Sequence, residues 1–258
     1  LEGHLRDRPD FLLQARRRGI EIEAGGHEFE TRLLPRAEFA GHPDWFRNVQ
    51  SGVTGKRSDD HNCCAASVGA RRAIEKNAAD HARKFPDVRV FHFWPADIEG
   101  GWCRCPACKH LPPTDQAVLC MNAVARGVRR VRRDALAVFI GYKATDPPPR
   151  FVQPERNLIY LAAPLARCYA HPLDDPTCPR NRRFRAAIDG QAAVFRGRAN
   201  AVFEYYSCGA VLHNLTPPLL DLIAADLGYY ERAGIRQVKT LVFSYRRLAP
   251  LELVTLWG

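Results

Sequence analysis

Two acidic side chains, Asp97 and Glu99, follow directly after the apolar run 88–94, which reads VRVFHFW. A run of this length and composition is typical of a strand that is buried on both faces of a parallel sheet. In α/β barrels, catalytic acids lie in the loops at the carboxyl ends of such strands. The alternative is an ordinary solvated turn, but Trp94 and Trp102 on either side of the acids favour a site.

A third acid, Glu204, lies in the apolar run 201–206, which reads AVFEYY and predicts another buried strand. Cleavage of a glycosidic bond generally uses two carboxyl groups that flank the scissile bond. One of them must be protonated near neutral pH, so its surroundings must raise its pKa. The alternative for Glu204 is a strand-end acid that pairs with an arginine.

A dense group of cysteines follows the first two acids. Cys103, Cys105 and Cys108 stand within the segment CRCPAC, in a chain that has nine cysteines. Thiolates at this spacing can hold a structural zinc ion, which needs a fourth ligand from Cys120, His110 or elsewhere. A disulfide that pins the loop is the alternative. A catalytic zinc or a cysteine nucleophile is less favoured, because no Cys-His-Asn signature is present.

Aromatic side chains suit the flat apolar faces of sugar rings, while polar side chains at the edges bind the hydroxyl groups. Core packing is the alternative, and for Trp94 and Tyr205, on apolar strands, it is at least as strong. Cys168 and Cys178 bracket His171 and predict either a local clip or a contribution to the same pin of the loop. The candidate substrate-binding residues are His27, Trp94, Trp102, Tyr142, Arg167, His171, Tyr205 and Tyr206.

Apolar strands that alternate with helices about six times must position these residues. This order predicts a parallel sheet with helices outside it. No GxGxxG or Walker-type loop favours a nucleotide fold, and acids and aromatics recur at the strand ends, which favours a (β/α)8 TIM-like barrel over an open sheet. Strands are expected at 20–24, 88–94, 135–142, 157–163, 201–206 and 238–245, and helices at 5–18, 68–84, 112–133, 181–195 and 217–233.

Details of this pattern give further expectations. Ser67 is a plausible N-cap for the helix 68–84, and the glycines at 25 and 26 allow a close approach of backbones. The stretch 28–62 is expected to be irregular, with one helical turn near 42–46. Six βα units in place of eight predict a single barrel domain over 1–258 whose first one or two units are missing.

Composition excludes some classes of protein and leaves others open. The chain has 258 residues, 46% of them hydrophobic, and a formal charge of +10, which suits one folded domain. The excess arginines lie in helix-like segments, without interleaved aromatics, so nucleic-acid binding is a minority interpretation. No apolar run approaches the roughly 20 residues of a membrane helix. The chain starts with Leu1, so secreted and cytoplasmic locations both stay open.

Several stretches, taken together and in order, resemble one family. They are GGHEFETRLLPRAEFAGHPDWF, WPADIEGGWCRCPAC, CYAHPLDDPTCPRNRRF and FEYYS. The chain is similar over residues 25–245 to the family catalogued as domain of unknown function 4838 (DUF4838), within which lies glycoside hydrolase family 163. The resemblance implies a catalytic (β/α)8 barrel and endo-β-N-acetylglucosaminidase-type cleavage of complex N-glycans.

The resemblance also orders the acids. Asp97 and Glu204 match the recurring acids of the family and are the main catalytic candidates, with Glu99 third. Asp97 and Glu99 share one side of an extended backbone, which suits a retaining hydrolysis that the 2-acetamido group of the substrate assists. The expected partner is a glycan or glycoprotein, and catalysis needs no cofactor. The rivals are a non-catalytic carbohydrate-binding barrel and a zinc-stabilised basic module that binds nucleic acid.

Overall fold

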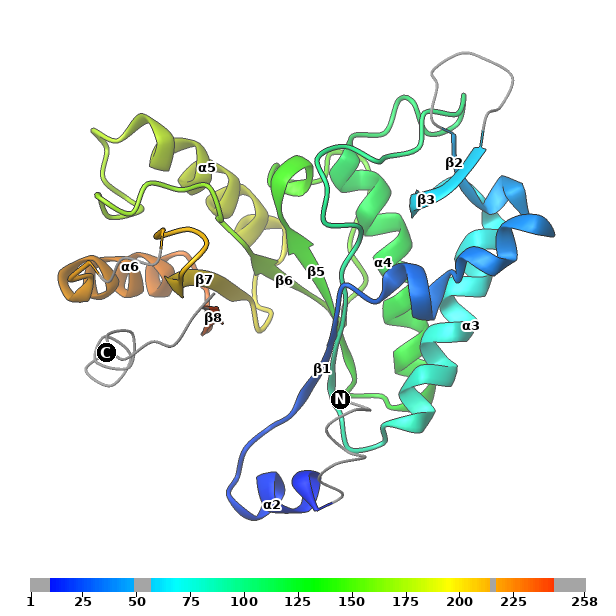
Figure 1. Cartoon of the computed structure of the whole chain (residues 1–258), viewed down its shortest axis with the longest axis horizontal. Coiled ribbons are helices and arrows are strands. Elements are labelled where there is room, and N and C mark those ends of the chain that lie inside the picture. Colours follow the sequence, from blue (N-terminus) through cyan, green and yellow to red (C-terminus); the bar gives the residue numbers. More distant parts are fainter. Residues whose placement is uncertain (1–9, 49–56, 214–216, 244–258) are drawn as a thin grey trace. The chain divides into compact units, whose positions relative to one another are not determined.

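The computed structural model describes residues 10–48, 57–213 and 217–243, and its elements are labelled in Figure 1. The chain divides into two compact units. The first comprises residues 1–139 and 149–159, and the second comprises residues 140–148 and 160–258. Strands β5 and β6 contribute to both units, so the single-domain prediction stays a prediction.

Six strands form one sheet in the order β1-β4-β5-β6-β7-β8. Strand β1 pairs with β4, β4 with β5, β6 with β7, and β7 with β8, and all four pairs are parallel. Parallel strands that follow each other in chain order, with helices in between, define a (β/α) barrel type of fold with six strands, which confirms the predicted fold class. The strands are β1 (Glu23–Gly26), β4 (Val90–Phe93), β5 (Leu136–Gly141), β6 (Leu158–Ala162), β7 (Ala201–Cys208) and β8 (Gln237–Phe243).

The helices occupy most of the connections between these strands. The connection between β5 and β6, residues 142–157, has no α-helix. It contains a 3-10 turn, Lys143–Thr145. The α-helices are α2 (Phe11–Arg17), α3 (Val68–Lys84), α4 (Pro113–Val131), α5 (Pro179–Val194) and α6 (Leu220–Arg232).

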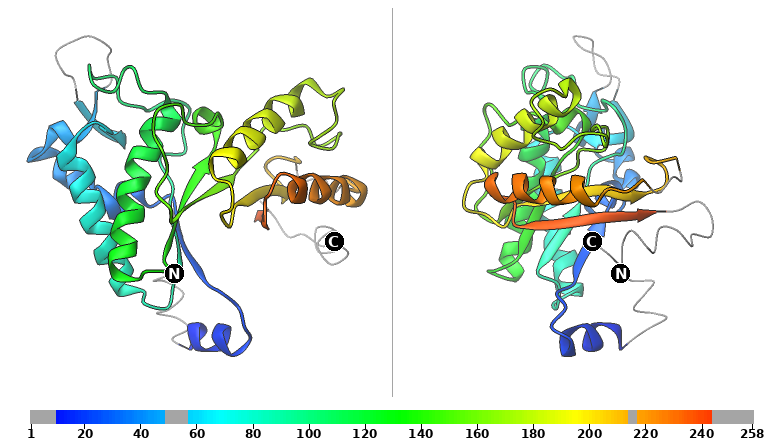
Figure 2. Two further views of the ribbon diagram at one scale, coloured as in Figure 1. Left: turned by 180° about the vertical axis from the view of Figure 1, so that it is seen from behind. Right: turned by 90° about the vertical axis from the view of Figure 1, so that its left-hand side faces the viewer.

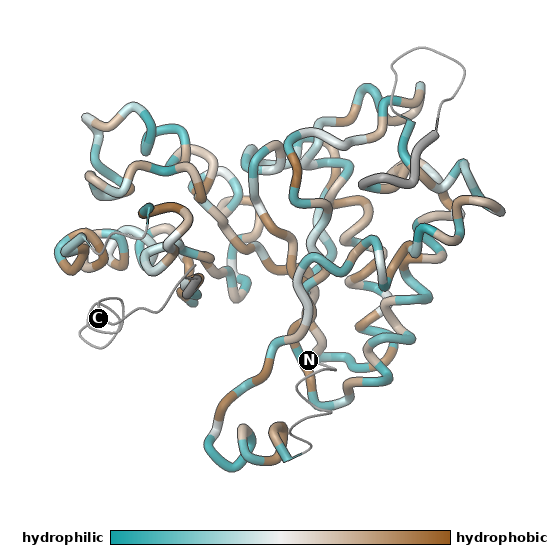
Figure 3. Tube along the Cα trace, in the orientation of Figure 1, coloured by the Kyte–Doolittle hydropathy of each residue, from teal (hydrophilic) through white to brown (hydrophobic). Residues whose placement is uncertain are grey.

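Helices α3 and α4 lie side by side in the first unit (Figure 2). Along both helices the hydropathy alternates between apolar and polar (Figure 3), as in helices that bury one face. Gly127 of α4 permits their close approach, because a Cβ at this position would lie 2.3 Å from the carbonyl oxygen of Glu75 on α3. The predicted cap of α3 is confirmed, since the hydroxyl of Ser67 accepts a hydrogen bond from the amide of Ala70.

Strand β1 departs from its predicted bounds, because Gly25 and Gly26 belong to the strand and residues 20–22 do not. Gly25 pairs with His92 of β4 and has a φ of +118°. A Cβ on Gly25 would lie 1.8 Å from the His92 carbonyl oxygen. The expected close approach is therefore real, and it lies inside the strand instead of after it.

The stretch expected to be irregular, 28–62, contains short elements of its own. One turn of π-helix (Phe29–Leu33) and two 3-10 turns (Arg36–Ala40 and Pro43–Trp45) precede an antiparallel pair of strands. The expected helical turn near 42–46 is confirmed. The paired strands are β2 (Phe46–Asn48) and β3 (Arg57–Cys63).

Candidate functional site

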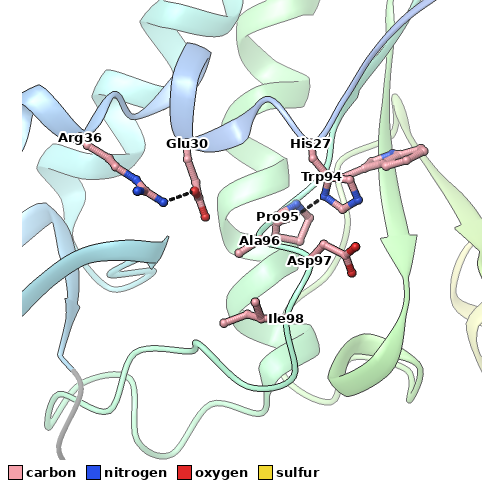
Figure 4. Close-up of a pocket in the computed structure, with 8 residues that line it drawn as sticks. All are labelled: His27, Glu30, Arg36, Trp94, Pro95, Ala96, Asp97 and Ile98. Carbon is pink, nitrogen blue, oxygen red and sulfur yellow. Dashed lines mark hydrogen bonds and ion pairs between the residues drawn. The ribbon is translucent and has the colours of Figure 1, made fainter.

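The loop after β4 borders a hollow of about 200 Å³ in the first unit. Asp97 lies in this loop and is exposed. Figure 4 shows the Asp97 carboxylate and the Ile98 side chain leaving the loop on opposite sides. An ion pair between Arg36 and Glu30, 2.7 Å long, borders the same hollow. The hollow is lined by His27, Glu30, Arg36, Trp94, Pro95, Ala96, Asp97 and Ile98.

His27 follows directly after β1 and has a fixed tautomer if it is neutral. Its Nδ1 lies 2.9 Å from the carbonyl oxygen of Pro95, which can only accept, so Nδ1 carries the hydrogen and donates it. The other ring nitrogen, Nε2, is then an acceptor. The ring also meets the indole of Trp94 edge to face, with centroids 5.2 Å apart. His27 therefore offers an oriented hydrogen-bond acceptor beside an aromatic surface.

A second histidine, His92 of β4, supports Trp94 from within the sheet. The indole Nε1–H of Trp94 donates to His92 Nδ1 over 3.2 Å. His92 Nε2 lies 2.6 Å from the carboxylate of Glu23 on β1, to which it donates. Because Nδ1 must accept and Nε2 must donate, this chain of hydrogen bonds selects one neutral tautomer. The indole of Trp94 is thus held in place by a buried histidine and a carboxylate.

The expected extended backbone, which would place Asp97 and Glu99 on the same side, is not present at residues 97–99. The backbone bends over 97–99, and the amide of Ile98 donates to the carbonyl of Ala96. Glu99 is exposed and does not line the hollow. The geometry therefore distinguishes the two acids and favours Asp97.

Two amide side chains clamp the loop that carries these acids. Asn62 accepts from the amide of Ala96 and donates to the carbonyl of Gly101, so it joins the two ends of the bend. Gln116 of α4 accepts from the amide of Cys103 and donates back to the carbonyl of the same residue. Trp102, between the clamps, is half-buried. The loop thus has a defined position on the first unit.

The predicted cysteines come together in this unit. Cys103, Cys105 and Cys108 are buried, and a residue that the sequence did not single out, Cys64, joins them. The adjacent pair at 63 and 64 was the available signal. Of the two named candidates for a fourth ligand, His110 is exposed, whereas Cys120 contacts Cys63 with a sulfur–sulfur distance of 2.8 Å.

Glu204, in the second unit, is fully buried and is the centre of a polar network. Arg167 donates to its Oε1 over 2.8 Å, and the hydroxyl of Tyr230 donates to the same oxygen. The hydroxyl of Tyr169 and the amide of Tyr205 donate to Oε2, over 3.0 Å and 3.2 Å. The pairing with an arginine, weighed as the alternative for Glu204, is therefore present. All four contacts treat the carboxylate as an acceptor, which suits a charge-stabilising or nucleophilic role better than that of a proton donor.

Asp226 of α6 is a second fully buried acid in this network. It accepts from Arg167 over 2.6 Å, from the hydroxyl of Tyr206 over 2.8 Å and from the amide of Leu173 over 2.7 Å. Burial lowers the pKa of Arg167, but the charge of Glu204 and the hydrogen bond to Asp226 outweigh it and raise that pKa overall. Sequence reasoning missed Asp226, although an aspartate within an otherwise apolar helical stretch was a signal.

The remaining candidates in the second unit differ in exposure. Tyr205 and Tyr206 are buried, as core packing would have them, whereas His171 is exposed and its Nδ1 lies 3.3 Å from the sulfur of Cys168. Tyr142 is half-buried beside Lys143, whose ammonium lies 4.8 Å from the ring centroid. Their predicted roles in substrate binding stay predictions.

The comparisons with known proteins agree with this fold. The chain belongs to the family described as "Domain of unknown function (DUF4838)", whose model matches residues 7–241. It is similar in structure to the lactosyl-enzyme intermediate of endo-glycoceramidase II from Rhodococcus sp., with a TM-score of 0.50 and 12% sequence identity. The match covers 98% of this chain and 65% of that chain. The comparison with curated proteins found no match.

This similarity is at the level of the fold: the solved structure is a glycoside hydrolase, and the likeness supports a glycosidase-like fold here. The chain spans 65% of the length of that enzyme. Within the described residues, no helix is both long and apolar enough to cross a membrane.

Proposed function

We propose that this chain is the barrel domain of a glycoside hydrolase that cleaves β-N-acetylglucosaminide linkages in complex glycans. The observation that carries the proposal is Asp97, an exposed acid in a hollow at the carboxyl end of β4. This is the edge at which parallel barrels place their catalytic groups. His27 supplies an acceptor for a sugar hydroxyl, and Trp94, fixed by His92, supplies a face for a sugar ring.

The proposed division of labour assigns Asp97 to the reacting group. Asp97 protonates the oxygen of the leaving sugar while the oxygen of the substrate's 2-acetamido group attacks the anomeric carbon, so the glycosidic bond breaks and an oxazolinium ion forms. Water then opens this ion, and the Asp97 carboxylate takes up the proton that the water releases. For Glu204, the other predicted acid, which lies in the second unit, the hydrogen bonds from Arg167 and from Tyr169 fit a carboxylate that stabilises positive charge. This scheme proceeds with retention of configuration and needs no cofactor.

The related solved structure suggests a different retaining scheme. That structure is of a lactosyl-enzyme intermediate, which forms when an enzyme group attacks the sugar directly. For this chain, Glu204 would then be the nucleophile. Trapping distinguishes the schemes: a covalent glycosyl adduct on Glu204, detected by peptide mass spectrometry, supports direct attack, and inhibition by an N-acetylglucosamine thiazoline supports assistance by the substrate.

A non-catalytic carbohydrate-binding barrel is the second candidate, and the burial of Glu204 favours it. A carboxylate at 0% exposure that already accepts four hydrogen bonds is the arrangement expected of a structural anchor. A binding protein would need Trp94 and His27 but no reacting acid. Asp97→Asn separates the candidates, because binding should survive the change and turnover should not.

Nucleic-acid binding is not proposed. Several of the arginines are neutralised by acids of the same unit, as in the pairs Arg89 with Glu21 and Arg126 with Glu75. A surface of such pairs offers less free positive charge to a phosphate backbone than the net charge suggests.

The test is hydrolysis of a complex N-glycoprotein, followed by mass spectrometry of the glycan and nuclear magnetic resonance of the first product anomer. We expect release between the two core N-acetylglucosamines, with β-anomer formed first. Asp97→Asn and Glu204→Gln should abolish it, and Glu99→Gln, an exposed neighbour outside the hollow, should retain it. Glycan binding without release supports the binding protein. Release that survives Asp97→Asn contradicts the site.

A further inference from the structure

Four buried cysteine sulfurs converge in the first unit, away from the hollow at Asp97. Cys64, Cys103, Cys105 and Cys108 offer sulfur atoms that all lie within 4.8 Å of one another. We propose that these four cysteines bind one zinc ion in a closed tetrahedral site, with Cys64 as the fourth ligand. The proposal does not depend on the function proposed above.

The distances between the sulfurs fit a single small ion. A zinc–sulfur bond of about 2.3 Å places the corners of a tetrahedron about 3.8 Å apart. The sulfur of Cys64 lies 3.7 Å from that of Cys105 and 3.8 Å from that of Cys108. Two edges of the tetrahedron are thus already at the length that zinc requires. An iron–sulfur cluster has several metal atoms between its cysteines and needs a wider opening.

Hydrogen bonds to the sulfurs support a charged form of the site. The amide of Asn48 donates to the sulfur of Cys103, and the amide of Ala66 donates to the sulfur of Cys108, each over 3.3 Å. Four thiolates around Zn²⁺ carry a net charge of about −2, and such donors around the ligands offset part of it. These two backbone amides therefore offset part of the negative charge that four thiolates would bring to the site.

The backbone around the ligands is held before any metal binds. Gln116 of α4 joins both ends of the cysteine segment, because its amide group donates to the carbonyls of Cys103, Cys108 and Leu111. On the other side, the amide of Cys64 donates to the carbonyl of Trp45. Such preorganisation lowers the cost of ordering the ligands around the ion.

Four neutral thiols are a weaker explanation of the same cluster. Without a cation, the four buried sulfurs would carry protons in a closed space where they all lie within 4.8 Å of one another. A divalent ion removes the protons and binds the sulfurs instead.

The other cysteines provide matched controls. Cys120 is also buried in the first unit, but its sulfur contacts Cys63 and is not part of the cluster. Cys168, His171 and Cys178 form a separate group in the second unit, with three ligand atoms within 4.8 Å of one another. That group supplies only three ligands, two of them sulfur, and therefore predicts a different spectrum.

The experiment measures metal on protein purified with a reducing agent and without a chelator. We expect one zinc per chain by inductively coupled plasma mass spectrometry. Cys64→Ser should lose at least tenfold in zinc affinity, by titration of the apo-protein against a competing chromophoric chelator. Cys120→Ser and the double change Cys168→Ser with Cys178→Ser should keep one zinc.

Cobalt substitution of the unmodified protein tests the ligand set without any variant that could fail to fold. Four thiolates around Co²⁺ give intense sulfur-to-metal charge-transfer bands and tetrahedral d–d bands at the red end of the visible spectrum. Those bands, at one cobalt per chain, support the proposal. A spectrum of mixed nitrogen and sulfur ligands contradicts it and points to the cluster of His171.

Three other results would also overturn the proposal. They are unchanged zinc affinity in Cys64→Ser, absence of zinc binding by the reduced apo-protein, and disulfides among the four cysteines in alkylated, unreduced protein. Each separates this site from the proposed hydrolase, because none of the measurements uses a glycan.

Discussion

Arg167 and Glu204 form an ion pair, 2.8 Å between Nη1 and Oε1, in which both side chains are 0% exposed. The same nitrogen lies 2.6 Å from Asp226. One cation thus compensates two buried acids, and tyrosine hydroxyls complete their hydrogen bonds. Removal of one partner from such a group leaves a buried charge without compensation. The resulting loss of stability is far larger than the net stabilisation that the ion pair provides.

Arg167→Met should therefore lower the free energy of unfolding by about 3–5 kcal/mol. The change removes the cation but keeps a side chain of similar length, so the loss reports on charge more than on volume. Urea denaturation followed by circular dichroism measures it. Arg89→Met is the matched control, because Arg89 pairs with Glu21 at the surface and its loss should cost about 1 kcal/mol or less. Equal effects of the two changes would contradict the role of Arg167.

Gly25→Ala should destabilise the sheet strongly. The new Cβ would lie 1.8 Å from the carbonyl oxygen of His92, and the φ of +118° is unfavourable for any side chain. Strands β1 and β4 would have to separate, so we expect a loss of about 3 kcal/mol or more, as for other strained or overpacked sites. Thermal unfolding by calorimetry measures the effect.

Gly19→Ala is the control for this change, because Gly19 also has a positive φ, +68°, but has open space around its Cβ position. Its cost should be about 1 kcal/mol. A loss at Gly25 no larger than that at Gly19 would mean that the close approach of β1 and β4 is not a constraint on the fold.

The positions of the strands and helices were largely predictable, because the hydrophobic pattern and the caps within each segment specify that segment's structure. Helix α3 has the predicted bounds, since Ser67 caps it and its apolar side chains recur at helical spacing. Strand β1 was predicted too early in the chain, because Gly25 and Gly26 have no side chains and so contribute nothing to a hydrophobic pattern. Their strand conformation comes from pairing with β4.

The sites were less predictable, because they depend on contacts between distant residues. The sequence identified three cysteines of the cluster from their spacing, but Cys64 reaches them only through the fold. Asp226 lies in an otherwise apolar helical stretch, but the sequence does not show that Arg167 lies beside it. The sequence does not show that the backbone bends after Asp97, and this bend separates that acid from Glu99.

Tyrosine titration should reveal the buried network at alkaline pH. Burial, and then the charge of Glu204, raise the pKa of Tyr169 and Tyr206 well above the ordinary value. In the unfolded chain these groups ionise near pH 10. Their contribution to stability is therefore fully present below about pH 10 and is lost as the pH rises towards their higher values in the folded protein.

The ultraviolet absorbance of tyrosinate measures the titration of these tyrosines. We expect part of the absorbance change to occur at a pH above that of exposed tyrosines and to coincide with loss of the circular dichroism signal. In Glu204→Gln the buried tyrosines should ionise at lower pH, because the change removes the negative charge that opposes their ionisation. A single transition near pH 10 in the folded protein would contradict the burial of these hydroxyls.

Removal of zinc should loosen the loop that carries Asp97 without unfolding the second unit. In our proposal the ion fastens residues 103–108 to Cys64, while Asn62 and Gln116 hold the rest of the loop. A chelator should therefore speed amide hydrogen exchange over 95–111 by at least tenfold, because the ion would no longer add to the hydrogen bonds that hold this segment. Exchange in α5 and α6, which belong to the other unit, should stay within a factor of two. Addition of zinc should restore protection in the wild type and not in Cys64→Ser. Protection of 95–111 that is insensitive to the chelator in a protein shown to have lost its metal would mean that the clamps alone hold the loop.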